Sequence, residues 1–167
     1  MLNKGLSDPR LNHAYLDHAW IAAHIPHQGS MCLLDKVEAW TQEEIVCRAS
    51  SHHAVDNPLR AHDQLGISCG IEYAAQAMAV HGALLAPADS VKPCVGYLVS
   101  VRGVTMTATR LDDVQADLLI TATCIMSSEN NILYQFNVRA DGKLLLEGRA
   151  AVVLNADALA LNLGNNT

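Results

Sequence analysis

The chain has 167 residues, half of them hydrophobic and 17% charged, which fits one globular domain or two small ones. Its net charge is −6 at pH 7, and Lys and Arg are scattered singly along the sequence. This distribution argues against a nucleic-acid partner, because phosphate binding requires a basic surface patch. We expect no membrane span either, since no run of about 18 apolar residues occurs.

The cysteines point to the cellular compartment. There are five of them, an odd number, and they lie far apart in the sequence, each within an apolar stretch. This pattern favours reduced, buried cysteines in the cytoplasm over a disulfide framework or a metal site. The N-terminal residues also lack the apolar segment of a signal peptide. We therefore expect a cytoplasmic protein without a metal ion.

The first third of the chain predicts a short helix followed by a β-hairpin. Residues 15–24 place their apolar side chains on roughly one face of an amphipathic helix. A proline and a glycine then interrupt the chain, and residues 31–40 are predicted to form a strand. Residues 44–50 alternate apolar and polar side chains, which indicates a second strand, paired with the first through a turn at residues 41–43.

A polar loop and a long apolar helix follow. Residues 51–64 are rich in histidine and are interrupted by Pro58, and long polar loops in compact domains are often functional. Residues 67–86 are apolar nearly all round, so the helix that they form should be buried. Its alanines and Gly82 allow a sheet to approach closely, and Glu72 is its single acidic residue.

The rest of the chain predicts four strands, at residues 94–104, 116–127, 132–140 and 143–154. Turn signals separate the later strands, and the strongest is Asp141–Gly142. Antiparallel strands around one buried helix form an α+β layout. We predict a single domain over residues 1–167, with its core at about residues 15–154 and a flexible tail at residues 155–167.

Three segments in a fixed order carry a family resemblance. They are residues 25–37 (IPHQGSMCLLDKV), 71–79 (IEYAAQAMA) and 96–102 (GYLVSVR). Each resembles the corresponding segment of the 3-hydroxyacyl-acyl-carrier-protein dehydratases, most closely of the subfamily found with aryl-polyene and related lipid gene clusters. The resemblance covers about residues 24–154. It implies a hotdog fold, in which an antiparallel sheet wraps one central helix.

One position departs from the pattern of that family. Its better-known members carry a catalytic histidine in a short loop before the helix glutamate, where this chain has Asn57. An asparagine cannot take up a proton at neutral pH, so another histidine would have to serve as the base. The choice lies among His27, His52 and His53. We favour His27, because the preceding Pro26 fixes its backbone at the entrance of a predicted strand.

The chemistry that the resemblance implies is dehydration of a 3-hydroxyacyl thioester, which removes the C2 proton and expels the C3 hydroxyl as water. It needs a base, an acid for the leaving oxygen and donors for the thioester carbonyl. We predict His27 as the base. Glu72, on an apolar helix, is predicted to be the acid, with a pKa raised by burial. The two side chains should then lie about 5–8 Å apart across one cleft.

Four further residues are predicted to contact the substrate, although each also has a structural reading. Asn57 could hydrogen-bond the substrate or simply form a turn. The backbone around Gly70, at the helix N-terminus, could polarise the thioester carbonyl. Gln76, one turn after Glu72, could hydrogen-bond that carboxyl or the backbone. Tyr97 could line an acyl tunnel or belong to the core.

Three functions remain open on these residues. The first is a 3-hydroxyacyl thioester dehydratase that needs no cofactor and acts on an acyl group carried by acyl carrier protein or CoA. The second is an acyl thioesterase, since hotdog enzymes share the helix carboxylate. The third is a non-catalytic subunit of a heterodimeric dehydratase, which the missing loop histidine favours over the second. An unpaired sheet edge also predicts a homo- or heterodimer with another hotdog protein.

Overall fold

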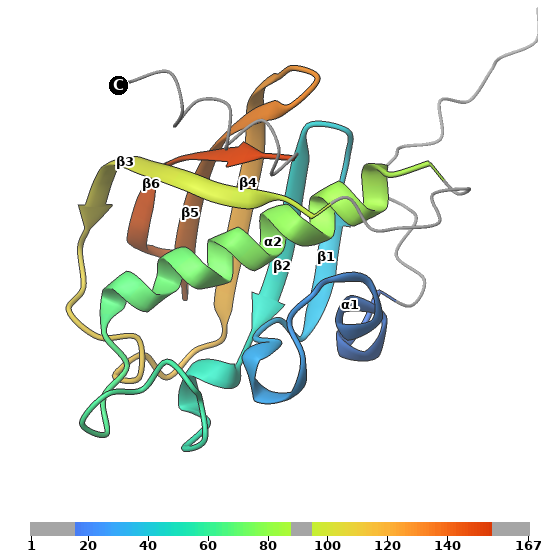
Figure 1. Ribbon diagram of the computed structural model, residues 1–167. Coiled ribbons are helices and arrows are strands. Elements are labelled where there is room, and N and C mark those ends of the chain that lie inside the picture. The colour runs from blue at the N-terminus through green and yellow to red at the C-terminus, as the bar shows by residue number, and fades with distance from the viewer. Residues whose placement is uncertain (1–15, 88–94, 155–167) are drawn as a thin grey trace, which may run out of the picture.

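A six-stranded antiparallel sheet wraps around one long helix, α2 (Figure 1). The computed structural model describes residues 16–87 and 95–154. The predicted tail lies outside these residues. The helices and 3₁₀ turns are α1 (His18–His24), η2 (Gly29–Met31), η3 (Ser51–His53), η4 (Ile67–Cys69) and α2 (Gly70–Leu85). The strands are β1 (Lys36–Trp40), β2 (Glu44–Ala49), β3 (Tyr97–Met106), β4 (Leu118–Ser127), β5 (Asn131–Ala140) and β6 (Lys143–Val153).

All the predicted helices and strands are present, and the α+β prediction is confirmed. The largest shift concerns the strand predicted at residues 31–40, which begins only at Lys36. The reason is local, because Gly29 has a positive φ of 59° and opens a 3₁₀ turn where the prediction had a loop leading directly into the strand. The long helix also starts later than predicted, at Gly70, after a separate 3₁₀ turn.

The order of strands in the sheet is β1-β2-β4-β5-β6-β3. The chain therefore leaves α2 and returns at the far edge, where β3 pairs with β6. Within the described residues the other side of β3 has no strand partner. Tyr97, Leu98, Val99 and Met106 of this edge strand are each 40–45% exposed. An unpaired edge with exposed apolar side chains is a surface that proteins normally cover.

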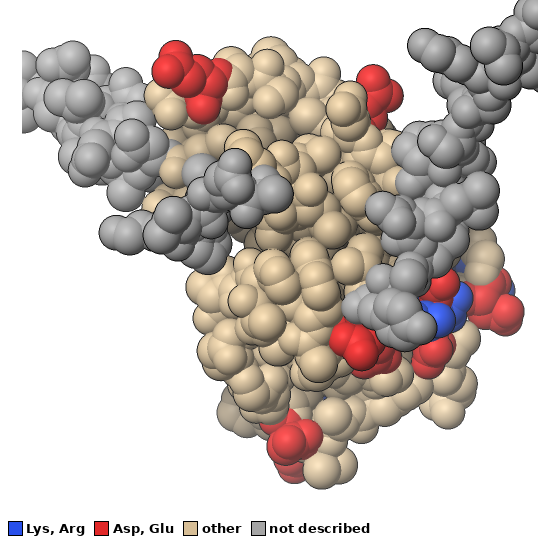
Figure 2. All heavy atoms as spheres, turned by 90° about the vertical axis from the view of Figure 1, so that its right-hand side faces the viewer, with Lys and Arg blue, Asp and Glu red and all other residues tan. Residues whose placement is uncertain are grey.

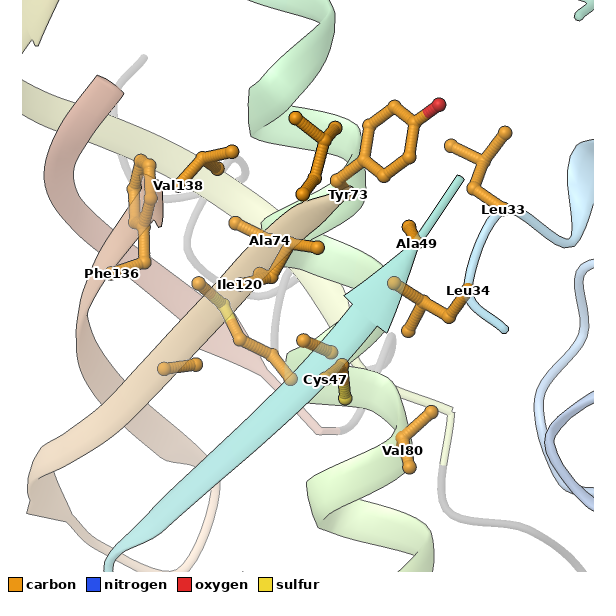
Figure 3. Close-up of a cluster of buried hydrophobic side chains, with 14 of the residues drawn as sticks. Leu33, Leu34, Cys47, Ala49, Tyr73, Ala74, Val80, Ile120, Phe136 and Val138 are labelled. Atoms are coloured by element: carbon orange, nitrogen blue, oxygen red, sulfur yellow. The ribbon is translucent and has the colours of Figure 1, made fainter. Parts of the chain in front are cut away.

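The hydrophobic core lies between α2 and the sheet, as Figure 3 shows. Tyr73, Ala74 and Val80 of the helix are fully buried there. The facing side chains from the sheet and from the segment before it are Leu33, Leu34, Cys47, Ala49, Ile120, Phe136 and Val138. No helix in the described part of the chain has the length and apolar character needed to cross a membrane.

Two glycines occupy positions that other residues would fill only with strain, one in a close helix–strand contact and one in a turn. A Cβ on Gly70 would lie 2.7 Å from Cδ2 of Leu146, so the start of α2 can approach β6 because it has no side chain. Gly142 has a φ of 72° and follows Asp141 at 49°. Two consecutive positive φ values define the tight turn that suits a two-residue hairpin. The turn predicted between β5 and β6 is thereby confirmed.

Candidate active site

His27 and Glu72, predicted as the catalytic residues, lie in direct contact. His27 belongs to the short link between α1 and η2, and Glu72 lies in the first turn of α2. The Nε2 atom of His27 is 3.1 Å from Oε1 of Glu72. Both side chains are partly exposed, by 26% and 30%. The contact is closer than the separation that we predicted across a cleft.

Gln76 explains why these two residues meet. Its side chain is fully buried, and its Nε2 donates to Oε1 of Glu72 at 3.1 Å and to the carbonyl of Met31 at 2.8 Å. Its Oε1 accepts a hydrogen bond from the amide of Leu33 at 2.9 Å. One amide group therefore ties the first turns of α2 to the segment that follows His27. The predicted hydrogen bond to Glu72 is present, but Gln76 is enclosed by protein instead of facing a ligand.

The predicted charge state of Glu72 is wrong. Burial does raise the pKa of this carboxyl, as we expected, but hydrogen bonds from His27 and Gln76 and the nearby imidazole lower it. The net effect is a pKa below the ordinary value, so that the group is a carboxylate at neutral pH. A carboxyl that is ionised at neutral pH is poorly suited to protonate a leaving hydroxyl. Glu72 is therefore suited to stabilise a positive charge on His27 instead.

The contact also decides which nitrogen of His27 is basic. A carboxylate only accepts hydrogen bonds, so Nε2 must carry the proton that faces Glu72. The lone pair of the neutral ring is then on Nδ1. Nδ1 is shielded from solvent and has no hydrogen-bond partner among the described residues. The pair thus resembles the histidine–carboxylate arrangement in which a carboxylate orients the ring and stabilises the imidazolium that forms.

A cavity of about 550 Å³ opens beside this pair. Its lining comes from α1 and the link after it, from α2 between Glu72 and Leu84, and from β3, β5 and β6. Tyr97 is among the residues that line this cavity. Figure 2 shows the side of the molecule on which α1 and the end of α2 lie, where charged side chains are few. The cavity is suited to an apolar ligand with one reactive end at His27 and Glu72.

The sequence reasoning missed two aromatic residues of the cavity wall. The rings of Trp20 and His24 stack with centroids 3.9 Å apart, and both residues line the cavity. Nδ1 of His24 donates to the carbonyl of Trp20 at 2.7 Å, which leaves Nε2 as the acceptor of the neutral ring. Their spacing of four residues within the predicted amphipathic helix was the signal that could have placed them on one face.

Two of the predicted substrate contacts lie away from the cavity. Asn57 is only 5% exposed, and its side chain bonds the carbonyl of Ser51, the hydroxyl of Tyr73 and the amide of Leu59. Gly70 is buried against β6, and its amide donates to carbonyls of the preceding 3₁₀ turn. Neither residue lines the cavity. Their structural reading, packing and turn formation, is the one that the geometry supports.

The alternative histidines are also remote from the cavity. His52 is fully buried and His53 is exposed, and the Nε2 atoms of both donate to the carbonyl of Val114, at 3.1 and 2.7 Å. Neither ring lines the cavity. Among the described residues no group of three or more His, Cys, Asp or Glu side chains is placed to hold a metal ion.

The fold and the site place this chain in the class of hotdog proteins. Three solved structures illustrate the match. The chain resembles the dehydratase heterocomplex ApeI:P from Xenorhabdus doucetiae with a TM-score of 0.74 and 20% identity, over 91% of this chain and 99% of that one. It resembles zebra fish thioesterase superfamily member 2 (TM-score 0.58, 15% identity, 83% and 95% covered) and a mutant thioesterase from Pseudomonas aeruginosa (0.53, 13%, 71% and 78%). At these identities the likeness concerns the fold.

The particular family follows from the sequence itself. The ApeP dehydratase family matches residues 19–162, which is most of the chain. No curated protein matches it significantly. The chain therefore belongs to the ApeP-like dehydratase family, and the resemblance stated from its three segments is confirmed. Its class of activity is that of a dehydratase.

Proposed function

We propose that this protein dehydrates a 3-hydroxyacyl thioester to the 2-enoyl thioester, with His27 as the residue that transfers the proton. The observation that carries the proposal is the 3.1 Å contact between His27 and the Glu72 carboxylate at one end of an apolar cavity. A histidine beside a carboxylate is a competent general base near neutral pH. The cavity offers room for the acyl chain next to that base.

The reaction can be written with one histidine. The imidazole of His27 takes the C2 proton, which becomes acidic because the thioester carbonyl stabilises the resulting charge. Because Nδ1 is enclosed in the structure, the ring must turn to present its unprotonated nitrogen to the substrate. The imidazolium that forms is held by the Glu72 carboxylate. The same proton then moves to the C3 hydroxyl, the C–O bond breaks, and water leaves. Base and acid are thus the same ring, which removes the need for Glu72 to carry a proton.

The substrate carrier and the partner complete the proposal. We propose a cytoplasmic role on acyl groups attached to acyl carrier protein or CoA, in aryl-polyene or a similar fatty-acid-like biosynthesis. The exposed apolar edge of β3 supports pairing with a second hotdog subunit, either another copy or a different protein. The related dehydratase from Xenorhabdus doucetiae is a heterocomplex, which favours the second option.

A non-catalytic subunit is the competing function. The observation that favours it is Asn57, which stands at the loop position of the family's usual histidine and has its polar atoms bonded within the protein. In that case a partner subunit would supply the base, and His27 would be dispensable.

The test is to incubate the purified protein, alone and with a co-expressed hotdog partner, with a 3-hydroxyacyl carrier-protein thioester. Mass analysis distinguishes loss of water from loss of the whole acyl group. We expect loss of water, and we expect His27→Ala to lower the rate by about 100-fold or more. Loss of the acyl group would indicate a thioesterase. Unchanged dehydration by a complex that contains His27→Ala would establish the non-catalytic subunit.

A further inference from the structure

Gly82 is a glycine that the packing of this chain does not explain. It lies within α2, where glycine is less favourable than alanine by roughly 1 kcal/mol. A Cβ on Gly82 would meet no atom within 4 Å, and its backbone does not have a positive φ. Gly70 at the other end of the same helix differs, since a Cβ there would collide with Leu146. The packing of the described residues therefore leaves the space in front of Gly82 open.

That space belongs to the same cavity as the His27–Glu72 pair. Gly82 lines the cavity together with small residues on the same side of α2, among them Ala75 and Ala79. The residues that face them are apolar ones such as Leu98 and Val152. No Lys, Arg or Asp occurs among the described residues that line this cavity. The polar residues of the lining are few, among them His27 and Glu72 at the proposed site, and most of the other lining residues are apolar, which suits a hydrocarbon chain.

The length of the helix gives the reach of such a chain. Gly82 lies ten residues after Glu72, which corresponds to about 15 Å along the helix axis. An extended hydrocarbon chain advances by about 1.25 Å per carbon, given its bond lengths and angles. A chain that starts at the His27–Glu72 pair and follows α2 therefore passes Gly82 after about 12 carbons.

We propose that the acyl chain of the substrate lies along α2 and that Gly82 keeps the cavity open for long chains. The inference rests on the proposed function, since it takes the reacting end of the substrate to lie at His27. It names a substrate class, thioesters whose acyl chain extends about 12 carbons beyond the reacting atoms, and a residue that sets this limit. The competing occupant of the space is a helix of a partner subunit.

The experiment compares Gly82→Leu with Gly82→Ala in the full-length protein, in whatever oligomer it forms. Gly82→Ala is the matched control, because it adds helix propensity and one methyl group but little bulk. The substrates are 3-hydroxyacyl thioesters with a four-carbon and an eighteen-carbon chain. Binding of unreactive acyl-pantetheine thioethers of both lengths is measured in parallel, together with sedimentation of each variant.

Gly82→Leu should lower kcat/KM and affinity for the eighteen-carbon chain by at least about 10-fold and change both for the four-carbon chain by less than about twofold. Gly82→Ala, which adds a single methyl group, should lower kcat/KM for the long chain less than Gly82→Leu does, and it should raise the melting temperature. Equal losses for both chains, no loss for either, or a changed oligomer with Gly82→Leu would overturn the proposal. If the natural protein dehydrates neither substrate, the proposed function fails, while the binding data still decide the role of Gly82.

Discussion

Two neighbouring residues of α2, Glu72 and Tyr73, lead to polar clusters of opposite character. Glu72 is partly exposed, lines the cavity and contacts His27, whose Nδ1 has no partner in the described structure. Tyr73 is fully buried, and its hydroxyl bonds Ser51 at 2.8 Å and Asn57 at 3.1 Å. The first cluster borders a cavity, whereas the polar groups of the second are bonded to one another inside the protein.

The difference shows how this protein departs from its better-known relatives. The loop at Asn57 holds the position where the resemblance leads one to look for the catalytic histidine. In this chain that loop is a structural cluster, which joins η3 to the start of α2 through Tyr73. The residue that we propose as the base, His27, instead contacts Glu72, the neighbour of Tyr73 on the same helix. In this chain contact with the cavity, more than position in a family pattern, distinguishes the candidate site from the buried network.

The largest expected effect comes from Glu72→Gln. The change keeps the shape of the side chain and a hydrogen bond to His27, but it removes the negative charge that would stabilise the imidazolium. We expect dehydration to fall by about 100-fold, with the fold unchanged by circular dichroism and urea unfolding.

Tyr73→Phe is the matched control for this change. It removes one hydroxyl from the adjacent residue and should lower the free energy of unfolding by about 1 kcal/mol while activity per folded molecule stays the same. If Tyr73→Phe reduces turnover as much as Glu72→Gln does, the two clusters do not differ in function, and the assignment of a structural role to the Tyr73 cluster is wrong.

A smaller effect, on stability alone, is expected from Asn57→Ala. The change leaves the carbonyl of Ser51 and the amide of Leu59 without their partner in a site that is only 5% exposed. The free energy of unfolding should drop by about 1–3 kcal/mol in urea titrations. Activity per folded molecule should be retained below the temperature at which the variant unfolds. Loss of turnover in a fully folded Asn57→Ala protein would return the loop to the active site.

The elements of this fold could be predicted from sequence because they depend on local patterns. The apolar character of residues 67–86 predicted the buried helix, and Asp141–Gly142 predicted the last hairpin, both of which the structure contains. The sheet order could not be predicted, because it depends on contacts between distant segments such as β3 and β6. The 3₁₀ turn at Gly29 was missed for a different reason. A positive φ is a property of the backbone, and it produces no periodic pattern of apolar residues from which the turn could be predicted.

The site shows the same division between local and distant information. His27 and Glu72 were chosen from their sequence surroundings, and the structure brings them together. The pKa of Glu72 was predicted in the wrong direction, because the apolar helix indicated burial but not the two hydrogen bonds from His27 and Gln76. The cavity beside Gly82 was invisible for the same reason, since an empty volume is defined by side chains from several elements.

The smallest expected effect concerns the pH dependence of stability and the loop histidine His52. Burial lowers the pKa of His52, and the neighbouring His53 lowers it further, while the carbonyls of Val114 and Ala116 and the charge of Asp117 oppose this shift. An exposed histidine in the unfolded chain titrates near pH 6.5, so below that pH the unfolded state takes up a proton that the folded state does not. The stability contributed by neutral His52 is therefore complete above about pH 6.5 and declines as the pH falls toward the lowered value, by at most about 1.4 kcal/mol per pH unit.

The experiment compares the free energy of unfolding in urea at pH 7.5 and at pH 5.5. This free energy should decline less for His52→Gln than for the natural protein, because glutamine can still donate to Val114 but does not titrate. Buried His81, whose pKa is also lowered by burial, should keep part of the decline in both proteins. An equal decline of the free energy of unfolding in the two proteins would mean that His52 is not buried in a neutral form. If His52→Gln lost dehydration activity at pH 7.5, this histidine would have to take part in the chemistry together with His27.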